Sequence, residues 1–272
     1  MKASVIMSTY NAEAWLEKVL WGFSVQTEKD FEIIIADDGS GPATKQLLDN
    51  LVKQLPVPLT HVWQEDNGFQ KTQILNKAIM ASRSDYLIFT DGDCIPRADF
   101  VATHLENRRE GYFLSGGYFK LPMQTSIAIR RDDILLQRCF DVIWLKKHGL
   151  NTKKTGKLTA KGFKAKFLNF ITPTTASWNG HNASAYKKEL IAVNGFNTRM
   201  QYGGEDRELG ERLFNKGLKS KQIRYSAICI HLDHARGYIS DEAWKNNNEI
   251  REYTRKHKVI RTLTGIETIQ VP

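Results

Sequence analysis

Hydrophobic and polar residues follow two different periods along the first hundred positions of the chain. Short apolar runs of strand length are separated by stretches in which apolar side chains recur every three to four residues, as in Trp15, Val19 and Phe23. The first pattern is typical of buried strands and the second of amphipathic helices. Strands that alternate with helices predict an α/β fold with a mostly parallel, Rossmann-like central sheet and helices on both faces. The predicted strands are residues 3–9, 31–36, 59–63 and 86–90, and helices are expected around Trp15–Phe23, up to Leu55 and at Gln70–Ser82.

Polar side chains stand at the end of each predicted strand. Because the carboxyl ends of parallel strands meet at one edge of a sheet and open onto the ligand crevice, we expect these side chains to line one crevice. A nucleotide fits there, since carboxylates accept hydrogen bonds from ribose hydroxyls and base N–H groups. Neither a GxGxxG motif nor a P-loop follows any of these strands, so the phosphate charge must be met by a metal and by side chains. The polar pairs are Ser8/Tyr10, Asp37/Asp38, Glu65/Asp66 and Asp91/Asp93.

Asp91-Gly92-Asp93 is the clearest candidate for metal binding. Two carboxylates separated by one residue repel each other unless a cation lies between them. Mg²⁺ and Mn²⁺ prefer oxygen ligands and usually take one or two carboxylates together with the phosphate oxygens of a substrate. The pattern therefore favours a metal–diphosphate site. A solvated acidic turn is the alternative, because aspartate is also common in turns.

The middle of the chain changes in composition after a predicted helix at 96–109, a strand at 112–115 and a helix from Asp132 to Trp144. Lysines interleaved with Phe163, Phe167 and Phe170 crowd residues 146–170, which contain no aspartate or glutamate. We expect a mobile basic loop there. It could lie on an anionic membrane, hold a lipid-linked diphosphate acceptor, or be only a solvated basic loop.

A second group of polar residues lies in the last third of the chain. Tyr202-Gly203-Gly204 precedes Glu205 and Asp206, which open an amphipathic helix. Acids in a first helical turn are favoured by the helix dipole, which is sufficient to explain their presence. Two glycines directly before them would also let the backbone approach a ligand closely, and a carboxylate beside a sugar hydroxyl can act as a general base.

The residues after position 225 contain few candidate functional groups. The predicted strand from Ser226 to Ile230 ends in His231-Leu232-Asp233-His234, and a lone histidine is more often structural than a ligand. A charged helix is expected at 242–256 and a strand-like end at 266–271, with no visible catalytic group. Packing or an oligomer contact is the expected role of this end.

Composition limits the classes of partner. The net charge of +9 over 272 residues indicates an acidic partner: nucleic acid, an anionic membrane or a phosphate-bearing ligand. No RNP, zinc-finger or helix-turn-helix pattern accompanies the charge, so nucleic acid is not expected. Three widely spaced cysteines predict neither a disulfide framework nor a zinc site and fit a reducing cytoplasm. Without a stretch of ~20 apolar residues, the expected location is cytoplasmic, peripheral at most on the inner face of the membrane.

Three motifs together carry a family resemblance. Residues 4–11 (SVIMSTYN), 37–40 (DDGS) and 91–93 (DGD) resemble a family 2 glycosyltransferase with the GT-A fold. The resemblance implies a nucleotide-sugar donor, usually a UDP-sugar, and Mn²⁺ or Mg²⁺. Gln64 belongs to a stretch that borders the donor site in such proteins. The donor-binding positions that the resemblance implies are Ser8, Tyr10, Asp38, Asp66, Lys71, Asn76 and Asp91.

The block from Trp178 to Asp206 resembles the C-terminal region of β-1,4-galactosyltransferases and bacterial chondroitin-type polymerases. The resemblance implies that Asp206 is the catalytic base, and that Glu205, Tyr202 and Gly204 contact the acceptor. Tyr202 stands where the family typically has Trp. The resemblance also implies that Asn182 borders the donor. The implied metal ligands are Asp93 and His231, with His234 as an alternative or additional ligand.

These observations predict a metal-dependent inverting glycosyltransferase that moves a sugar from a UDP-sugar to a saccharide or lipid-linked acceptor in cell-surface glycan synthesis, such as lipopolysaccharide or capsule. Residues 1–110 would bind the donor, 111–237 the acceptor, and 238–272 form a helical extension. A haloacid-dehalogenase-like phosphatase is one alternative, although Ile95-Pro96 departs from its pattern. A non-catalytic carbohydrate- or membrane-binding protein of the same fold is the other.

Overall fold

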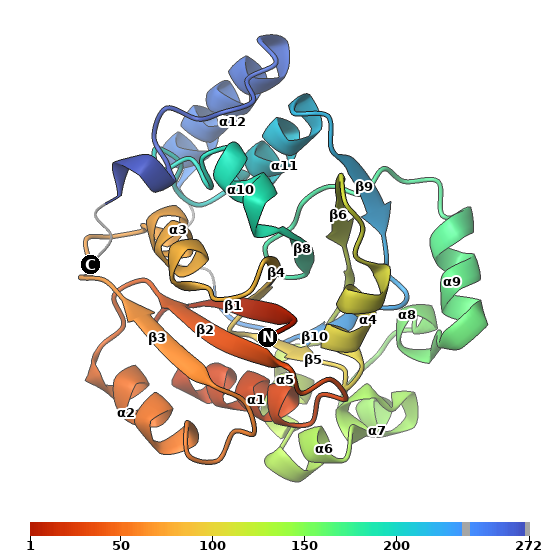
Figure 1. Ribbon diagram of the computed structural model, residues 1–272. Coiled ribbons are helices and arrows are strands. Elements are labelled where there is room, and N and C mark those ends of the chain that lie inside the picture. The colour runs from red at the N-terminus through yellow and green to blue at the C-terminus, as the bar shows by residue number, and fades with distance from the viewer. Residues whose placement is uncertain (236–239, 270–272) are drawn as a thin grey trace.

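A seven-stranded sheet forms the centre of the protein in a computed structural model that describes residues 1–235 and 240–269 (Figure 1). The four strands of the first hundred residues run parallel, as predicted, in the order β3-β2-β1-β4. The sheet continues with β8, which is antiparallel to β4 and β6, and ends with β9 parallel to β6. The two segments expected to bind donor and acceptor, 1–110 and 111–237, therefore both contribute strands to one sheet. The strands are β1 (Ala3–Thr9), β2 (Phe31–Asp37), β3 (Leu59–Trp63), β4 (Tyr86–Asp91), β6 (Tyr112–Ser115), β8 (Ala183–Tyr186) and β9 (Lys219–Gln222).

Helices cover both faces of the sheet, as the sequence predicts. Along β1, Val5 and Met7 point into one hydrophobic cluster and Ile6 into the other, which is the alternation of a strand buried on both sides. The first cluster includes side chains of α1 (Glu13–Ser24), α2 (Pro42–Leu51) and α4 (Phe100–Asn107). The second includes α3 (Lys71–Ala81), α10 (Lys187–Ala192) and α11 (Glu205–Asn215), which lie together above the sheet (Figure 1).

A small second sheet, which the sequence did not predict, orders the residues around Asp93. It joins β5 (Cys94–Pro96), β10 (Ile228–His231) and β7 (Gly117–Lys120) in the order β5-β10-β7. The expected helix at 96–109 begins only at Phe100, because β5 pairs with β10. In this register His231 lies opposite Cys94, directly beside Asp93.

The middle of the chain differs from the prediction in two places: one expected helix is broken, and an expected loop contains helices. The single helix expected from Asp132 to Trp144 is broken where Gln137 takes a left-handed φ of 56° and where Asp141 caps a new helix start. The basic segment 146–170, expected to be a loop, instead contains two helices whose buried side chains Leu158 and Ala165 anchor them. The elements here are α5 (Met123–Ala128), α6 (Arg131–Leu135), η1 (Arg138–Phe140), α7 (Val142–Lys147), α8 (Gly156–Thr159) and α9 (Gly162–Ile171).

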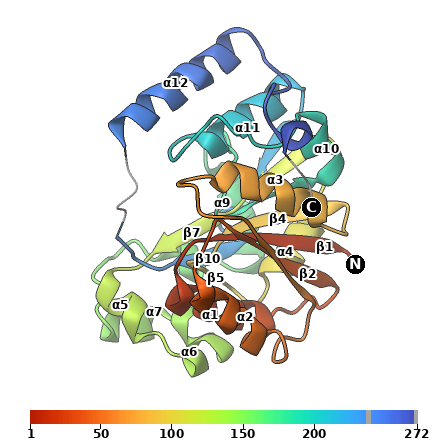
Figure 2. The same ribbon diagram turned by 90° about the vertical axis from the view of Figure 1, so that its left-hand side faces the viewer.

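The end of the chain contains the predicted helix, α12 (Asp241–Lys256), which packs over α11 (Figure 2). The strand expected at 266–271 is wrong for its first part, because Ile266–Thr268 form the 3₁₀ helix η2. Its last residues, and the boundary expected at 237/238, lie outside the described residues. No helix in the described parts of the chain is both long and apolar enough to cross a membrane.

Candidate functional site

The polar ends of the parallel strands meet at one edge of the sheet, as the sequence predicts. β1 and β4 are paired in a register that sets Ser8 opposite Asp91, and the Ser8 hydroxyl donates to Asp91 Oδ1 at 2.7 Å. The Tyr10 hydroxyl donates to Asp66 Oδ2 at 2.9 Å. Four residues predicted to bind the donor are therefore gathered in two hydrogen-bonded pairs.

Asp38 lies beside these pairs and is held by two donors. The Gln64 amide donates to Asp38 Oδ1 at 2.7 Å, and the Gln70 backbone N–H donates to Oδ2 at 2.9 Å. Burial raises the pKa of Asp38 to about 6, against the opposing effect of these two hydrogen bonds. Asp38 thus changes charge close to neutral pH.

Lys71 links residues predicted to bind the donor to Glu205 and Asp206 at the start of α11. Its ammonium group donates to Asp91 Oδ1 at 2.9 Å. Burial alone would lower the pKa of Lys71, but the charges of Asp91, Asp206 and Glu205 raise it above its usual value. Burial likewise opposes ionisation of Asp91, yet Lys71 and the Ser8 hydroxyl hold the pKa of Asp91 well below its usual range. One cation is therefore shared by three carboxylates.

Asp206 is placed by an unusual backbone turn at the start of α11. Gly203 and Gly204 take φ values of 109° and 90°, which are accessible to glycine at little cost. The Gly180 N–H donates to Asp206 Oδ2 at 2.8 Å, while the buried Oδ1 has no hydrogen-bond partner within the described residues. Burial and the neighbouring charge of Glu205 raise the pKa of Asp206 to about 7, although Lys71 lowers it. Such a carboxyl group can exchange a proton near neutral pH.

Glu205, unlike Asp206, accepts a hydrogen bond from within its own loop. Its Oε2 accepts the Gly203 N–H at 2.9 Å, which closes the turn that precedes α11. Glu205 is buried. The structure gives it a role in shaping the loop as well as a position next to Asp206.

Asp93 and both candidate histidines come together at the end of the small sheet. Asp93 Oδ2 lies 3.6 Å from His231 Nε2 and 2.9 Å from His234 Nε2. His234 Nδ1 lies 2.8 Å from the Ala235 carbonyl oxygen, so this nitrogen carries a proton. His234 Nε2 then has a lone pair facing a carboxylate oxygen unless a cation or a second proton lies between them. The arrangement fits a divalent cation.

The rest of this cluster agrees with a cation site. One ligand atom each of Asp93, Cys94 and His231 lies within 4.8 Å of the others. The buried Nδ1 of His231 has no hydrogen-bond partner among the residues that the structure describes, and burying a polar atom without a partner is costly. A carboxylate with imidazoles suits Mn²⁺ better than Mg²⁺, because imidazole is the softer donor. The Cys94 thiol is already turned to Asp93 Oδ1 at 3.4 Å.

Two residues predicted to bind the donor are structural instead. Asn76 is fully buried and exchanges two hydrogen bonds of 2.8 Å with the backbone of Phe196. Asn182 is also fully buried: its Nδ2 donates to the carbonyls of Gly117 and Ala227, and its Oδ1 accepts from His104 Nε2 at 2.9 Å. Neither side chain has a free polar atom or an exposed surface for a nucleotide sugar. These two predictions were wrong.

His181 is a site residue that the sequence analysis missed. It is enclosed beside Tyr118, with ring centroids 4.6 Å apart. Burial lowers the pKa of His181 to about 4, although Asp91 and Asp93 both favour its charged form. The imidazole is therefore neutral at pH 7, and it lies close enough to Asp91 and Asp93 to sense both charges. Its signal was its place in the polar stretch Asn179–Asn182, where only Asn182 was singled out.

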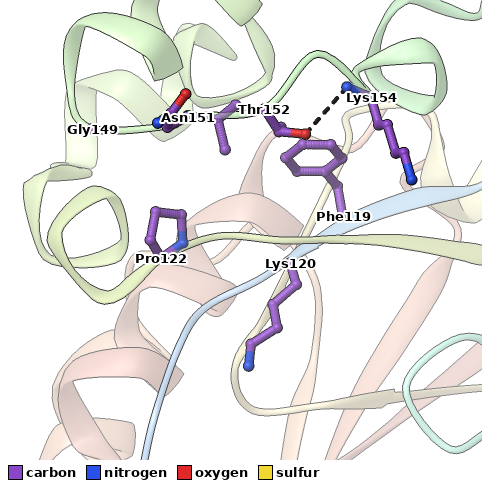
Figure 3. Close-up of a pocket in the computed structure, with 8 residues that line it drawn as sticks. Phe119, Lys120, Pro122, Gly149, Asn151, Thr152 and Lys154 are labelled. Atoms are coloured by element: carbon purple, nitrogen blue, oxygen red, sulfur yellow. Dashed lines mark hydrogen bonds between the residues drawn. The ribbon is translucent and has the colours of Figure 1, made fainter.

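A hollow of about 440 Å³ is lined by Phe119, Lys120 and Pro122 on one side and by Thr152 and Lys154 on the other (Figure 3). Lys120 at the end of β7 lies opposite His231 in the small sheet, and its ammonium group is 3.3 Å from Asp233. Lys154 lies on the opposite rim. Two lysines therefore line the hollow.

The helix α12 holds the loop at 201–203, directly before Glu205 and Asp206, in place, a role that the sequence did not reveal. Asn247 is buried, and its amide donates to three consecutive carbonyls, those of Gln201, Tyr202 and Gly203, at 3.0, 3.3 and 2.8 Å. A side chain on Gly203 would overlap the Trp244 indole. The signal in the sequence was the run Asn246–Asn248, because asparagine is a poor former of helix interiors.

We expect Asn247→Ala to lower the transfer rate without removing the protein's ability to bind donor. Three carbonyls lose their shared donor, so the loop that positions Asp206 relaxes, and a misplacement of about 1 Å can cost on the order of 100-fold in rate. Steady-state kinetics should show a drop in kcat with little change in the KM for the donor. Asn248→Ala, at an exposed position of the same helix, is the matched control. An unchanged kcat in Asn247→Ala would contradict this role.

We expect His231→Ala and His234→Ala each to weaken Mn²⁺ binding by at least about tenfold. The affinity is measured by calorimetry with Mn²⁺ in the presence of UDP, so the readout does not depend on turnover. His257→Ala, on the exposed end of α12, is the control. If His234→Ala binds Mn²⁺ as tightly as the natural protein does, His234 is not a ligand.

Comparison with protein families agrees with this geometry. Residues 4–155 match the model of glycosyl transferase family 2. The chain belongs to this family. Residues 171–235 match a second model, described as the N-terminal domain of galactosyltransferase, and this segment contains Glu205, Asp206 and both histidines. The family match overturns the phosphatase alternative, whose motif shares only the strand followed by DxD.

Individual relatives are distant. An uncharacterised glycosyltransferase of Bacillus subtilis, YfnE, is 26% identical over 86% of this chain and 65% of its own length. A chondroitin synthase of Escherichia coli is 25% identical over 84% of this chain and 34% of its own length. This family 2 chain thus spans about one third to two thirds of these relatives.

Solved structures show the fold. GalNAc-T7, solved with UDP, GalNAc and Mn²⁺, superposes with a TM-score of 0.60 at 13% identity over 93% of this chain and 48% of its own chain. The similarity confirms the predicted GT-A type of α/β fold.

Proposed function

We propose that this protein is a metal-dependent inverting glycosyltransferase. It moves a hexosyl or N-acetylhexosaminyl group from a UDP-sugar to a saccharide or lipid-linked acceptor in the assembly of a cell-surface glycan, such as lipopolysaccharide or capsule. The observation that carries the proposal is the shared lysine: Lys71 donates to Asp91 among the donor residues and is held electrostatically by Asp206 and Glu205. The carboxylate assigned to the donor and the candidate base thus both interact with one ammonium group.

The chemistry assigned to Asp206 is proton removal from an acceptor hydroxyl. A carboxyl group with a pKa of about 7 is sufficiently basic to take this proton and still ionised enough at neutral pH to be ready for it. The hydroxyl oxygen attacks the anomeric carbon on the face opposite the leaving group. The new C–O bond forms as the bond to the diphosphate breaks, the bonding pair leaves with UDP, and the proton stays on Asp206.

The leaving diphosphate is assigned to the Asp93 cluster. A divalent cation held by Asp93 with His231 or His234 would neutralise the negative charge that grows on the departing group. Lys120 lies near enough to the same cluster to add positive charge. Ser8, Tyr10 and Asp38 are assigned to the nucleoside, where their hydrogen-bonding atoms line the strand ends.

The acceptor class is supported by the second family match and by the relatives. The match over 171–235 includes the loop that carries Asp206. The name of the chondroitin synthase describes an enzyme that builds a polysaccharide. A saccharide acceptor is therefore the first class to test, followed by lipid-linked sugars.

A donor screen tests the proposal directly. The protein is incubated with UDP-hexoses and UDP-N-acetylhexosamines, and UDP release is measured with Mn²⁺ and after chelation. We expect release from one donor that requires the metal, and in the presence of an acceptor a product of inverted anomeric configuration by NMR. If calorimetry finds no metal-dependent UDP binding, the non-catalytic carbohydrate- or membrane-binding hypothesis is favoured instead.

A further inference from the structure

Helix α9 turns a stripe of large apolar side chains toward solvent. Phe163, Phe167, Phe170 and Ile171 are 84%, 51%, 88% and 49% exposed. Their spacing of i, i+4, i+7 and i+8 puts all four on one helix face, which is the pattern that normally faces a core. These four residues are called the apolar stripe below. A stripe of this size exposed on one helix indicates an interaction surface.

The opposite face of α9 is fixed to the body of the protein. Ala165 is buried. The Asn169 amide donates to Ser226 Oγ at 2.8 Å and its Oδ1 accepts the Tyr225 N–H at 2.9 Å, while the Gln222 amide donates to the Asn169 carbonyl at 3.3 Å. Figure 1 shows α9 at the periphery of the molecule, beside β9. The outward direction of the apolar stripe is therefore set by specific contacts.

Positive charge surrounds the apolar stripe. Lys161, Lys164 and Lys166 are all exposed, and no aspartate or glutamate occurs in the sequence from residue 142 to residue 188. Lys221 on the neighbouring strand β9 belongs to the same surface: burial and the nearby charges of Arg109 and Lys166 lower the pKa of Lys221. Aromatic side chains flanked by lysines on one exposed helix face are the composition of helices that lie in a membrane interface.

We propose that α9 docks on the surface of a bilayer that contains anionic phospholipids. The rings of the apolar stripe enter the boundary between headgroups and acyl chains, and the flanking lysines meet lipid phosphates. A second copy of the chain fits less well, because it would bring two sets of lysines together without acids to pair them. Docking adds a membrane contact to the proposed transferase without depending on it, and would bring the site to acceptors carried on lipids.

Vesicle co-sedimentation of the full chain tests this surface. We expect binding to vesicles of equal parts phosphatidylglycerol and phosphatidylcholine, and little binding to pure phosphatidylcholine. Replacing Lys161, Lys164 and Lys166 by Gln should weaken the partition coefficient by about fivefold per lysine, or on the order of 100-fold together. Replacing Phe163, Phe167 and Phe170 by Ser should abolish measurable binding at the same lipid concentration.

Matched controls come from exposed residues elsewhere. Leu263→Ser changes a side chain that is 89% exposed, and Lys53→Gln removes an exposed lysine after α2; both should bind vesicles as the natural protein does. Equal binding of the phenylalanine variant and the natural protein would overturn the proposal. Conversion of a dimer to a monomer by that variant in the absence of lipid, with vesicle binding unchanged, would make the stripe a contact between copies. UDP release, measured on the same variants, separates failure of docking from failure of the transferase.

Discussion

Asp206→Asn is expected to reduce sugar transfer by about 10²–10⁴-fold, the usual contribution of a positioned general base. The substitution removes the proton acceptor but keeps the size of the side chain. The Asn oxygen can still accept the Gly180 N–H that now reaches Asp206 Oδ2 at 2.8 Å. Donor binding should survive, because none of the hydrogen bonds among Ser8, Asp91 and Asp38 involves Asp206. Calorimetry with UDP and Mn²⁺, next to single-turnover transfer, separates the two effects.

The pH dependence gives the same base a second test. The pKa of Asp206 is about 7, so the carboxylate form is lost as the pH falls through 7. With saturating donor and acceptor we expect kcat to fall by about tenfold for each pH unit well below that value. Asp38, with a pKa of about 6, is assigned to donor binding and should affect the KM for the donor. A flat kcat profile from pH 5 to 8 would contradict the role of Asp206.

The unfolding temperature of Asp206→Asn shows whether its loss of activity is catalytic or comes from a folding defect. The folded state raises the pKa of Asp206 from its ordinary 3.8 to about 7, so it binds the proton more tightly than the unfolded state does. The ionised carboxylate therefore costs stability once the pH rises above the unfolded value. Asp206→Asn removes that cost, so it should unfold at the same or a higher temperature at pH 8. Glu205→Gln is the companion variant: near-normal transfer in Asp206→Asn with loss in Glu205→Gln would reassign the base.

The strand-end residues were predictable because parallel topology itself brings them together. Ser8 and Asp91 end neighbouring strands, so their hydrogen bond follows from the register of β1 and β4. The loop before Asp206 was predictable for a similar reason, since two consecutive glycines mark a backbone that other residues cannot adopt.

Residue type alone did not predict the structural roles of Asn76 and Asn182. Asn76 lies between Leu75 and Ala78 on the buried side of α3, where a polar side chain bonds to backbone. Asn182 fits because Gly116 has no side chain: a Cβ there would come within 2.0 Å of the Asn182 amide. Such partners are far apart in sequence, and no local pattern reveals them.

Tertiary contacts also explain why the lysine-rich segment 146–170 contains helices and is not a loop. Its density of charge and glycine is typical of a loop, yet Asn169 and Ala165 secure a helix against the turn after β9. His234 was predicted only as an alternative or additional ligand beside His231, for a comparable reason. Its distance to Asp93 depends on the pairing of β5 with β10 in a small sheet that the sequence analysis did not predict.

Lys71→Met should both destabilise the protein and raise the pH needed for transfer. Asp91, Asp206 and Glu205 would lose the cation that they share. We expect the free energy of unfolding to fall by about 3 kcal/mol at pH 7, the lower end of the cost of breaking a buried ion pair, because the Lys71 and Asp91 side chains are still 19% and 25% exposed. Lys71 lowers the pKa of Asp206, so its removal should move the midpoint of the kcat–pH profile above 7.

The direction of that pH shift separates an electrostatic role of Lys71 from a merely structural one. A variant that only loosened the fold would lose activity at every pH without moving the midpoint. Lys71→Arg keeps the positive charge and should hold the midpoint near 7, while Lys77→Met, on the same helix, should change neither stability nor the profile appreciably. If Lys71→Met and the natural protein share one midpoint, Asp206 does not sense the lysine, and the coupling of donor and acceptor carboxylates through one ammonium group is wrong.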